Sequence, residues 1–271
     1  MRRLLSLALA LVMVLSLAAC GGGVTVEINE ANFPDEFFRD YVKTEFDRDH
    51  SGTLTAGEIR AVKSIILHEK PLIRSLKGLE HFTALTDLWC TNCWMNELDV
   101  SRLTKLESLV CDSNRLTALD VSKNTALKTL CCNENQLTEL DVSANTALQR
   151  LECDGNQLTA LDLSANTALK ELSCGQNRLT VLDLNHNTAL QRLECKGNRL
   201  TTLDVSANTK LYQLDCKGNQ LTELDISACP NLIDVYTNGE GANSYYLEKG
   251  DRLYYMIADL TVEILTGETN N

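Results

Sequence analysis

The sequence predicts an α/β fold in which a repeating solenoid builds a parallel β-sheet, and two observations carry this prediction. A 21-residue period runs through most of the 271-residue chain. A cysteine marks the same place in seven successive periods, in the frame Leu-x-Cys-x-x-Asn or a close variant: Cys90, Cys111, Cys132, Cys153, Cys174, Cys195 and Cys216. A fixed period of about 20 to 29 residues is typical of solenoids in which each repeat adds one strand to the sheet.

The first residues have the pattern of an export signal. Arg2 and Arg3 precede an apolar run over residues 4–17, which is too short to span a bilayer comfortably. The run ends in Leu-Ala-Ala-Cys at residues 17–20 and resembles the lipobox of bacterial lipoproteins.

This resemblance implies that Cys20 becomes the lipid-attached N-terminus of the mature chain. We therefore expect residues 1–19 to be a lipoprotein signal peptide and residues 20–32 to be a tether. The protein would lie on the extracellular face of a cell membrane, held stably by two or more acyl chains. The alternative is an ordinary signal peptide cleaved near Ala19.

The charge of the chain excludes one class of partner. The formal net charge is -12, and loss of residues 1–19 would remove Arg2 and Arg3 and no acid, which gives -14. Such an acidic chain repels phosphate backbones, and the sequence has no basic stripe interleaved with aromatic residues. We therefore expect no nucleic-acid partner.

A helical cap is expected over residues 33–64. Pro34, Asp35 and Glu36 suit a helix N-terminus, and the aromatic and aliphatic residues that follow supply an apolar face. A second helix is expected over residues 56–64 and should lead into the solenoid.

The segment between these two helices matches the twelve-residue EF-hand loop. Oxygen donors stand at loop positions 1, 3, 5, 7, 9 and 12, position 7 donating through its backbone carbonyl, and Gly52 stands at the sharp turn. The predicted metal ligands are Asp47, Asp49, Ser51, Thr53, Thr55 and Glu58. A single loop with three acidic ligands predicts one weak Ca²⁺ site, with a Kd of about 0.1 to 1 mM, that fixes the angle between the helices.

Leucine-rich repeats are predicted over residues 62–240. After an irregular first repeat around Val62, Ile65 and Leu67, regular repeats begin at Leu85, Leu106, Leu127, Leu148, Leu169, Leu190 and Leu211, with a partial one at Leu232. Positions 1, 4, 6, 11, 14 and 16 of each repeat are apolar and should fill the core of a parallel-sheet horseshoe. The repeat then fails, and residues 241–271 are expected to form a small β cap over the open end.

Two polar columns are expected to be structural. Position 9 is asparagine in six repeats, where its amide can satisfy buried backbone groups of the turn: Asn114, Asn135, Asn156, Asn177, Asn198 and Asn219. Position 15 is aspartate in seven: Asp99, Asp120, Asp141, Asp162, Asp183, Asp204 and Asp225. These like charges would lie about 4.8 Å apart, and Asx-type hydrogen bonds to position 17 would offset their repulsion. A calcium-lined surface is the alternative for this second column.

The seven column cysteines are expected to be buried thiols. Equivalent side chains of an in-register parallel sheet lie about 4.8 Å apart and point the same way, whereas a disulfide needs convergent Cβ atoms about 3.8 Å apart. Cys90 and Cys93 form a Cys-x-x-Cys pair, but a thioredoxin-like site needs an exposed first cysteine, so redox catalysis is disfavoured. Cys131 is expected to point outward, as a reactive thiol or a small surface residue, and Cys229 replaces an asparagine at position 19.

Variation between repeats points to the strand face as the binding surface. The return path is nearly copied from repeat to repeat, whereas positions 3, 5 and 7 change each time. These positions are either unconstrained solvent sites or a tailored binding surface, and the exposed aromatic residues expected there favour the second interpretation. The predicted ligand-binding residues are Asp87, Trp89, Trp94, Val110, Asp112, Arg150, Glu152, Arg192, Glu194, Lys196, Asp215, Lys217, Asp234 and Tyr236.

The repeat Leu-x-x-Leu-x-Cys-x-x-Asn-x-Leu-Thr-x-Leu-Asp-Val-Ser-x-Asn-Thr-Ala resembles that of the internalins, bacterial surface proteins that include members with a comparable cysteine column. The likeness covers roughly residues 33–240. It implies a leucine-rich repeat fold, an N-terminal cap related to an EF-hand, and adhesion to a protein or glycan. Many internalin caps have lost their calcium ligands, whereas this loop retains them. Internalins of this type are usually attached to the cell wall at the C-terminus, whereas this chain carries an N-terminal lipoprotein signal.

The leading hypothesis is therefore a monomeric, lipid-anchored bacterial surface protein that recognises an extracellular protein or glycan through its concave face. A calcium-stabilised envelope spacer without a dedicated ligand is the first alternative. A surface enzyme is the second, and we expect no enzymatic activity because no spacing pairs the four histidines, His50, His68, His81 and His186, with a nucleophile.

Overall fold

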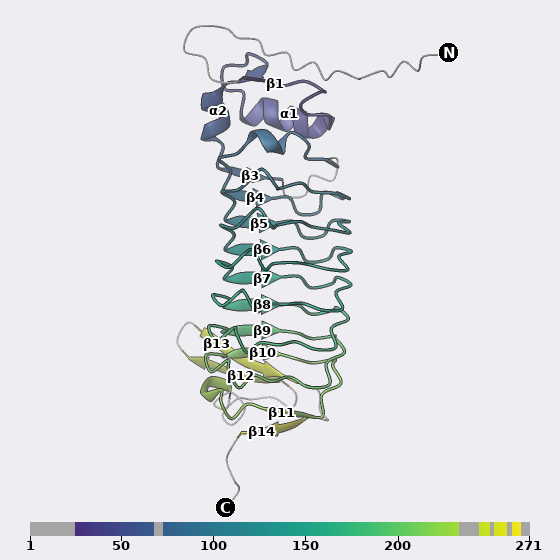
Figure 1. Ribbon diagram of the computed structural model, residues 1–271, viewed down its shortest axis with the longest axis vertical. Coiled ribbons are helices and arrows are strands. Elements are labelled where there is room, and N and C mark those ends of the chain that lie inside the picture. Colours follow the sequence, from purple (N-terminus) through teal and green to yellow (C-terminus); the bar gives the residue numbers. More distant parts are fainter. Residues whose placement is uncertain (1–24, 68–72, 233–243, 250–251, 259–261, 267–271) are drawn as a thin grey trace, which may run out of the picture.

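The structure is a computed structural model that describes residues 25–67, 73–232, 244–249, 252–258 and 262–266. Its main element is a ten-stranded sheet with the order β12-β13-β10-β9-β8-β7-β6-β5-β4-β3. Successive repeats supply eight of these strands: β3 (Ser64–Ile66), β4 (Asp87–Trp89), β5 (Ser108–Val110), β6 (Thr129–Cys131), β7 (Arg150–Glu152), β8 (Glu171–Ser173), β9 (Arg192–Glu194) and β10 (Gln213–Asp215). They pair in parallel and stack along the long axis of the molecule (Figure 1). The predicted leucine-rich repeat solenoid is confirmed.

Each of these three-residue strands turns its middle residue into the core. The middle residues stand in register, as in the pairs Ile65 with Leu88 and Leu88 with Leu109. Together with the cysteine at position 6 and the leucines of the return path, they are buried along the whole column. One repeat cannot bury its apolar stripe alone, so hydrophobic stabilisation comes from stacking one repeat on the next.

The position-9 asparagines form the expected ladder. Asn156 shows the pattern: its Nδ2 donates to the carbonyl oxygens of Cys132 at 3.0 Å and Cys153 at 3.1 Å, and its Oδ1 accepts from the backbone N–H of Leu137 at 3.0 Å. The side chain therefore links two consecutive repeats. The carbonyl oxygens of Cys132 and Cys153 each accept from a second ladder asparagine as well, Asn135 and Asn177 respectively.

Two cysteines replace ladder asparagines and make similar contacts. Cys93 stands at position 9, and its Sγ donates to the carbonyl oxygen of Leu67 at 3.2 Å. Cys229 stands at position 19, and its Sγ approaches the carbonyl oxygens of Val205 at 3.5 Å and Asn208 at 3.6 Å. Among the described residues no cysteine is in a disulfide, which agrees with the structural interpretation of the Cys-x-x-Cys pair.

The aspartate column has the expected Asx-type geometry. In each of its seven members, Oδ1 accepts from the backbone N–H two residues further on, at 2.8 to 3.0 Å. These hydrogen bonds lower the pKa of Asp141, for example, where the donors belong to Ser143. Local hydrogen bonding therefore accounts for this column without a metal ion.

The N-terminal cap lies at the β3 end of the column (Figure 1). It comprises β1 (Val26–Glu27), α1 (Glu36–Glu45), β2 (Thr53–Leu54) and α2 (Ala56–Ala61). Helix α2 is shorter than predicted because the chain is already extended at Val62 and enters β3 at Ser64. Strand β1 lies within the segment that we expected to be only a tether, so the folded cap begins before residue 33.

Asp35 joins the cap to the solenoid. It is the N-cap of α1, where its Oδ1 accepts from the N–H of Phe38 at 2.9 Å. Its Oδ2 accepts from the N–H groups of Arg74 at 2.9 Å and Ser75 at 3.2 Å, in the loop that follows β3. One carboxylate thus fixes both the start of the helix and its contact with the first repeat.

The C-terminal segment extends the sheet as well as covering its end. Strand β13 (Arg252–Ile257) pairs in parallel with β10, and β12 (Ser244–Lys249) pairs with β13 in an antiparallel hairpin. A separate two-stranded sheet joins β14 (Glu263–Leu265) to β11 (Glu223–Asp225). The expected small β cap is confirmed.

Candidate functional site

The exposed side of strands β3 to β10, here named the sheet face, changes character along the column. Its central line is formed by the last residue of each strand, and the strand register places these residues side by side. In order from β3 they are Ile66, Trp89, Val110, Cys131, Glu152, Ser173, Glu194 and Asp215. The first four are apolar and the last four are polar or acidic, so the two halves of the face suit different chemistry.

The apolar half is open to solvent at its N-terminal end. Ile66 is 52% exposed and Trp89 is 46% exposed, although they are neighbours in register. Trp94, beyond the end of β4, is 45% exposed and has a positive φ of 55°, a conformation that costs energy for a bulky residue. The Arg115 guanidinium lies 5.0 Å from the centroid of the Trp94 ring, within cation-π range.

The acidic half carries a chain of ion pairs across β7, β8 and β9. Arg150 pairs with Glu152 on its own strand and with Glu171 at 3.1 Å, and Arg192 pairs with the same Glu171 at 3.7 Å. Arg192 also donates from Nε to the hydroxyl of Tyr212 at 3.0 Å. The two arginines are therefore held toward Glu171, between their own strands.

A hollow of about 270 Å³ lies in this acidic half, and Ser173 and Leu172 contribute to its lining. Larger hollows of about 780 Å³ flank the aspartate column on the return side. The return-side hollow beside Asp141 is lined by residues of the copied return path, and the hollow beside Asp99 is also lined by Ser75, Lys77 and Glu80 from the segment before the regular repeats. The hollow around Ser173 lies on the sheet face, between two strands with the sequence Arg-Leu-Glu (β7 and β9) and centred on β8, which differs from both, so it is the stronger candidate for a specific contact.

A third polar ladder, at position 7, was not expected from the sequence. Asp112 Oδ1 accepts from the N–H of Asn133 at 2.7 Å, Asn133 Oδ1 accepts from the N–H of Asp154 at 2.8 Å, and Asp154 Oδ1 accepts from the N–H of Gly175 at 2.5 Å. Burial raises the pKa of Asp112 to about 6 and also raises the pKa of Asp154. The ladder escaped sequence analysis because its members differ in type, whereas position 9 repeats the same residue.

Two predictions for the sheet face are wrong. Cys131 is only 6% exposed, and burial raises the pKa of its thiol to about 12, so it is not a reactive surface thiol. Its side chain points to the sheet face but is short and stands in register between Val110 and Glu152. Asp215 is 9% exposed, because β13 continues the sheet beside it, so it is a poor candidate for ligand contact.

The remaining predicted face residues are distributed as follows. Arg150, Arg192 and Lys217 are exposed, and Asp87, Val110, Glu152, Glu194 and Lys196 are partly exposed. Asp234, Tyr236 and the predicted lipid-attachment residue Cys20 lie outside the described residues. No helix in the described part of the chain is long and apolar enough to cross a membrane.

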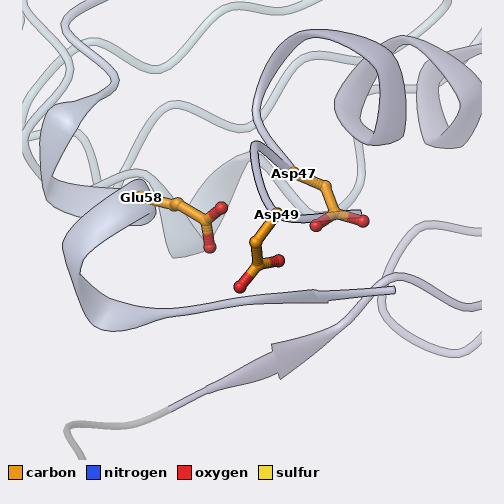
Figure 2. Close-up of side chains that lie close together, drawn as sticks. All are labelled: Asp47, Asp49 and Glu58. Carbon is orange, nitrogen blue, oxygen red and sulfur yellow. The ribbon is translucent and has the colours of Figure 1, made fainter. Parts of the chain in front are cut away.

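The predicted calcium loop brings its three acids together. Ligand oxygens of Asp47, Asp49 and Glu58 lie within 4.8 Å of one another, and Figure 2 shows the three carboxylates around a common space. Gly52 has a φ of 79°, as the sharp turn at loop position 6 requires. Oxygen donors in this arrangement suit a hard cation such as Ca²⁺.

Loop hydrogen bonds hold these acids in place. Asp47, which is 1% exposed, accepts from the N–H groups of Ser51 at 3.0 Å and Gly52 at 2.9 Å. Glu58 accepts from the N–H groups of Arg48 and Thr55, both at 2.8 Å, and these hydrogen bonds lower its pKa. Glu58 thus closes the loop and completes the capping box of α2 with Thr55.

The second strand beside the calcium loop comes from the start of the described chain. β2, which lies within the loop at positions 7 and 8, pairs antiparallel with β1, so that Val26 faces Leu54 and Glu27 faces Thr53. The N–H of Ile28 donates to the carbonyl oxygen of Gly52 at 3.0 Å. EF-hand loops usually pair with each other, and here a two-residue strand takes the partner's place.

Solved structures similar to this chain include leucine-rich repeat proteins from bacteria and plants. The functional domain of InlJ from Listeria monocytogenes, which includes a cysteine ladder, has 36% identity and a TM-score of 0.65 over 78% of this chain and 51% of that one. An internalin C2 from Listeria monocytogenes str. 4b F2365 has 22% identity and a TM-score of 0.68 over 76% and 92%. The ectodomain of the receptor kinase GASSHO1/SCHENGEN3 from Arabidopsis thaliana, solved in complex with CASPARIAN STRIP INTEGRITY FACTOR 2, has 20% identity and a TM-score of 0.50 over 62% and 26%.

No protein-family model matches the chain, and no curated protein matches it. The chain spans about half the length of the InlJ domain. The likenesses to internalin C2 and to the plant receptor concern the fold, whereas the InlJ domain is also said to include a cysteine ladder. By its fold, its 21-residue repeat and its cysteine column, the chain has an internalin-like leucine-rich repeat fold.

Proposed function

We propose that this chain is a non-enzymatic, lipid-anchored surface protein that recognises an extracellular macromolecule through its sheet face. The observation that carries the proposal is the exposure of Trp89 and Ile66 beside a face whose residues change at every strand. Large aromatic side chains that remain half exposed on a rigid sheet are the kind that anchor interfaces. The plant receptor ectodomain, which was solved in complex with another molecule, supports recognition as a use of the fold.

Binding can be tested by probing an array of extracellular proteins and glycans with the full chain. Trp89→Ala should weaken the binding of a captured ligand by more than about 1 kcal/mol, because an anchor residue loses its contact area. Lys170→Glu, an exposed residue at position 2 of its repeat, is the matched control and should have little effect. Absence of any ligand, or loss of binding in the control alone, would refute the proposal.

The lipid anchor is the second part of the proposal and rests on the Leu-Ala-Ala-Cys sequence at residues 17–20. Growth with a fatty-acid analogue should label the wild-type chain, and Cys20→Ala should abolish the label. Cys131→Ala is the matched control, since it removes a buried thiol and should leave labelling intact. Persistent labelling of Cys20→Ala would refute the anchor.

The third part of the proposal is a single weak Ca²⁺ site in the N-terminal cap, with the six ligands predicted above. Three convergent carboxylates, one of them buried, support it because a cation would offset their mutual repulsion. Calcium at ten times its Kd should stabilise the chain by about 1.4 kcal/mol. Glu58→Gln should lose this effect and Glu45→Gln, at the exposed end of α1, should keep it; equal melting of the wild type in calcium and in chelator would refute the site.

A further inference from the structure

We infer that the sheet face binds an extended protein segment that presents an apolar side chain and, about six residues away, a lysine or arginine. The inference rests on the proposed function and specifies its ligand class. It follows from the change of chemistry along the central line of the face and from the distance over which that change occurs.

The apolar end of the face offers a contact for one hydrophobic side chain. Ile66 and Trp89 are adjacent in register and about half exposed, and Val110 continues the line on β5. Adjacent exposed apolar side chains on neighbouring strands bury area together when a partner covers them. Because they project from a rigid sheet, little conformational entropy is lost on binding.

The acidic end offers a contact for one positive charge. The hollow is lined by four carboxylates and only two guanidinium groups: Glu152, Asp154, Glu171, Glu194, Arg150 and Arg192. Both guanidinium groups are held by Glu171, and Arg150 is also paired with Glu152. Lys196, at the rim of the hollow, pairs with Glu194 at 3.9 Å. One carboxylate therefore remains in excess around Ser173, and a cationic side chain complements it.

The sequence keeps this hollow open. Ser173 is the one small side chain between Glu152 and Glu194 in the central line. Behind it, a Cβ atom at Gly175 would lie 2.6 Å from Asp154 Oδ1 and 3.0 Å from the side chain of Lys196. Any larger residue at 175 would therefore displace the carboxylate of Asp154, which lines the hollow.

The spacing between the two contacts sets the length of the ligand. Trp89 on β4 and Ser173 on β8 are separated by four strand spacings, or about 19 Å along the sheet. An extended chain advances about 3.3 Å per residue, so about six residues span this distance. A neutral glycan could stack on Trp89 but would leave the one carboxylate in excess without a counter-charge, which is why a protein segment fits better.

The two tryptophans of the chain make the inference directly measurable, since both lie at the apolar end. The probe is the blocked peptide acetyl-Leu-Ser-Gly-Ser-Gly-Ser-Lys-amide, titrated into the full chain while tryptophan emission is recorded. A Trp94→Phe background assigns the signal to Trp89. We expect saturable binding that weakens about tenfold when the lysine of the peptide is acetylated or when the spacer is cut to one residue.

Two variants test the acidic contact. Glu152→Gln combined with Glu194→Gln should weaken the peptide about tenfold by removing charge, and Ser173→Gln should weaken it by filling the hollow without changing charge. Glu107→Gln, an exposed acid that does not line the hollow, is the matched control and should bind like the wild type.

Three results would overturn the inference. They are no change in tryptophan emission with the peptide, equal affinity for the acetylated peptide, and a response to maltotetraose or chitotetraose in place of the peptide. None of these results decides the proposed function, because the array experiment tests recognition by the sheet face whatever the ligand class.

Discussion

Single aspartates in this protein respond to pH in opposite directions according to where they stand in the repeat. In the column at position 15, hydrogen bonds from the following serine lower the pKa of residues such as Asp120, so their stabilisation is present above the unfolded pKa and is lost in acid. At position 7, burial raises the pKa of Asp112 from 3.8 to about 6. Its contribution has the other sign: the folded state binds the proton more tightly, and stability from this group falls as pH rises from about 4 to about 6.

Asp112→Asn should therefore stabilise the chain at pH 7 and have a smaller effect near pH 4. The asparagine oxygen can still accept the hydrogen bond from Asn133 N–H, so the change removes the charge and keeps the contact. Urea denaturation at the two pH values measures the difference. A variant that is less stable than the wild type at pH 7 would contradict a buried, unfavourable carboxylate at this position.

Substitution of a ladder asparagine should change the free energy of unfolding more than Asp112→Asn does. Asn156→Ala leaves the buried N–H of Leu137 without its acceptor and removes one of the two amide donors to each of the carbonyl oxygens of Cys132 and Cys153. We therefore expect a loss of about 2 kcal/mol in unfolding free energy. The neighbouring Gln157→Ala should change stability by less than about 0.5 kcal/mol. Equal effects of the two changes would show that the ladder contributes little.

At the scale of elements, a repeated pattern was predictable and single short elements were not. The period placed the seven strands β4 to β10 because each apolar position is repeated and must face the core, whereas β3 was expected from the apolar residues Val62, Ile65 and Leu67 of the irregular first repeat. Strand β1 has two residues and no periodicity, so only its tertiary pairing with β2 reveals it. Alternation along β6 correctly gave the direction of Cys131, but its exposure depends on the larger neighbours in register, which alternation does not describe.

The pairing of β1 with β2 should support the calcium loop. Ile28→Pro would remove the N–H that donates to Gly52 O, while Glu27 before it is already extended and can precede a proline. We expect calcium affinity to fall about fivefold, as the loss of one hydrogen bond implies. Ile28→Ala removes most of the side chain and keeps the N–H, so it should bind calcium more tightly than Ile28→Pro in isothermal titration. Equal affinities would show that β1 does not support the loop.

At the scale of the whole molecule, the repeats share nearly the same return path and differ from one another on the sheet face. The asparagine ladder and the aspartate column are copied from repeat to repeat, and their side chains are engaged in local hydrogen bonds. The sheet face carries the differences, with an apolar end near the cap and an acidic hollow around Ser173. The sequence predicted which residues lie on this face. It did not predict the ion pairs across β7 to β9 or the hollow, because both depend on the conformations of the side chains.

The central claim, recognition through the sheet face, is tested most directly by photo-crosslinking to the ligand captured on the array. A benzoylphenylalanine placed at Val110, in the middle of the apolar half, should crosslink to the ligand because it lies within the proposed contact surface. The same group at Lys123, exposed on the return side of its repeat, should not crosslink. Crosslinking from position 123 and not from position 110 would contradict the account.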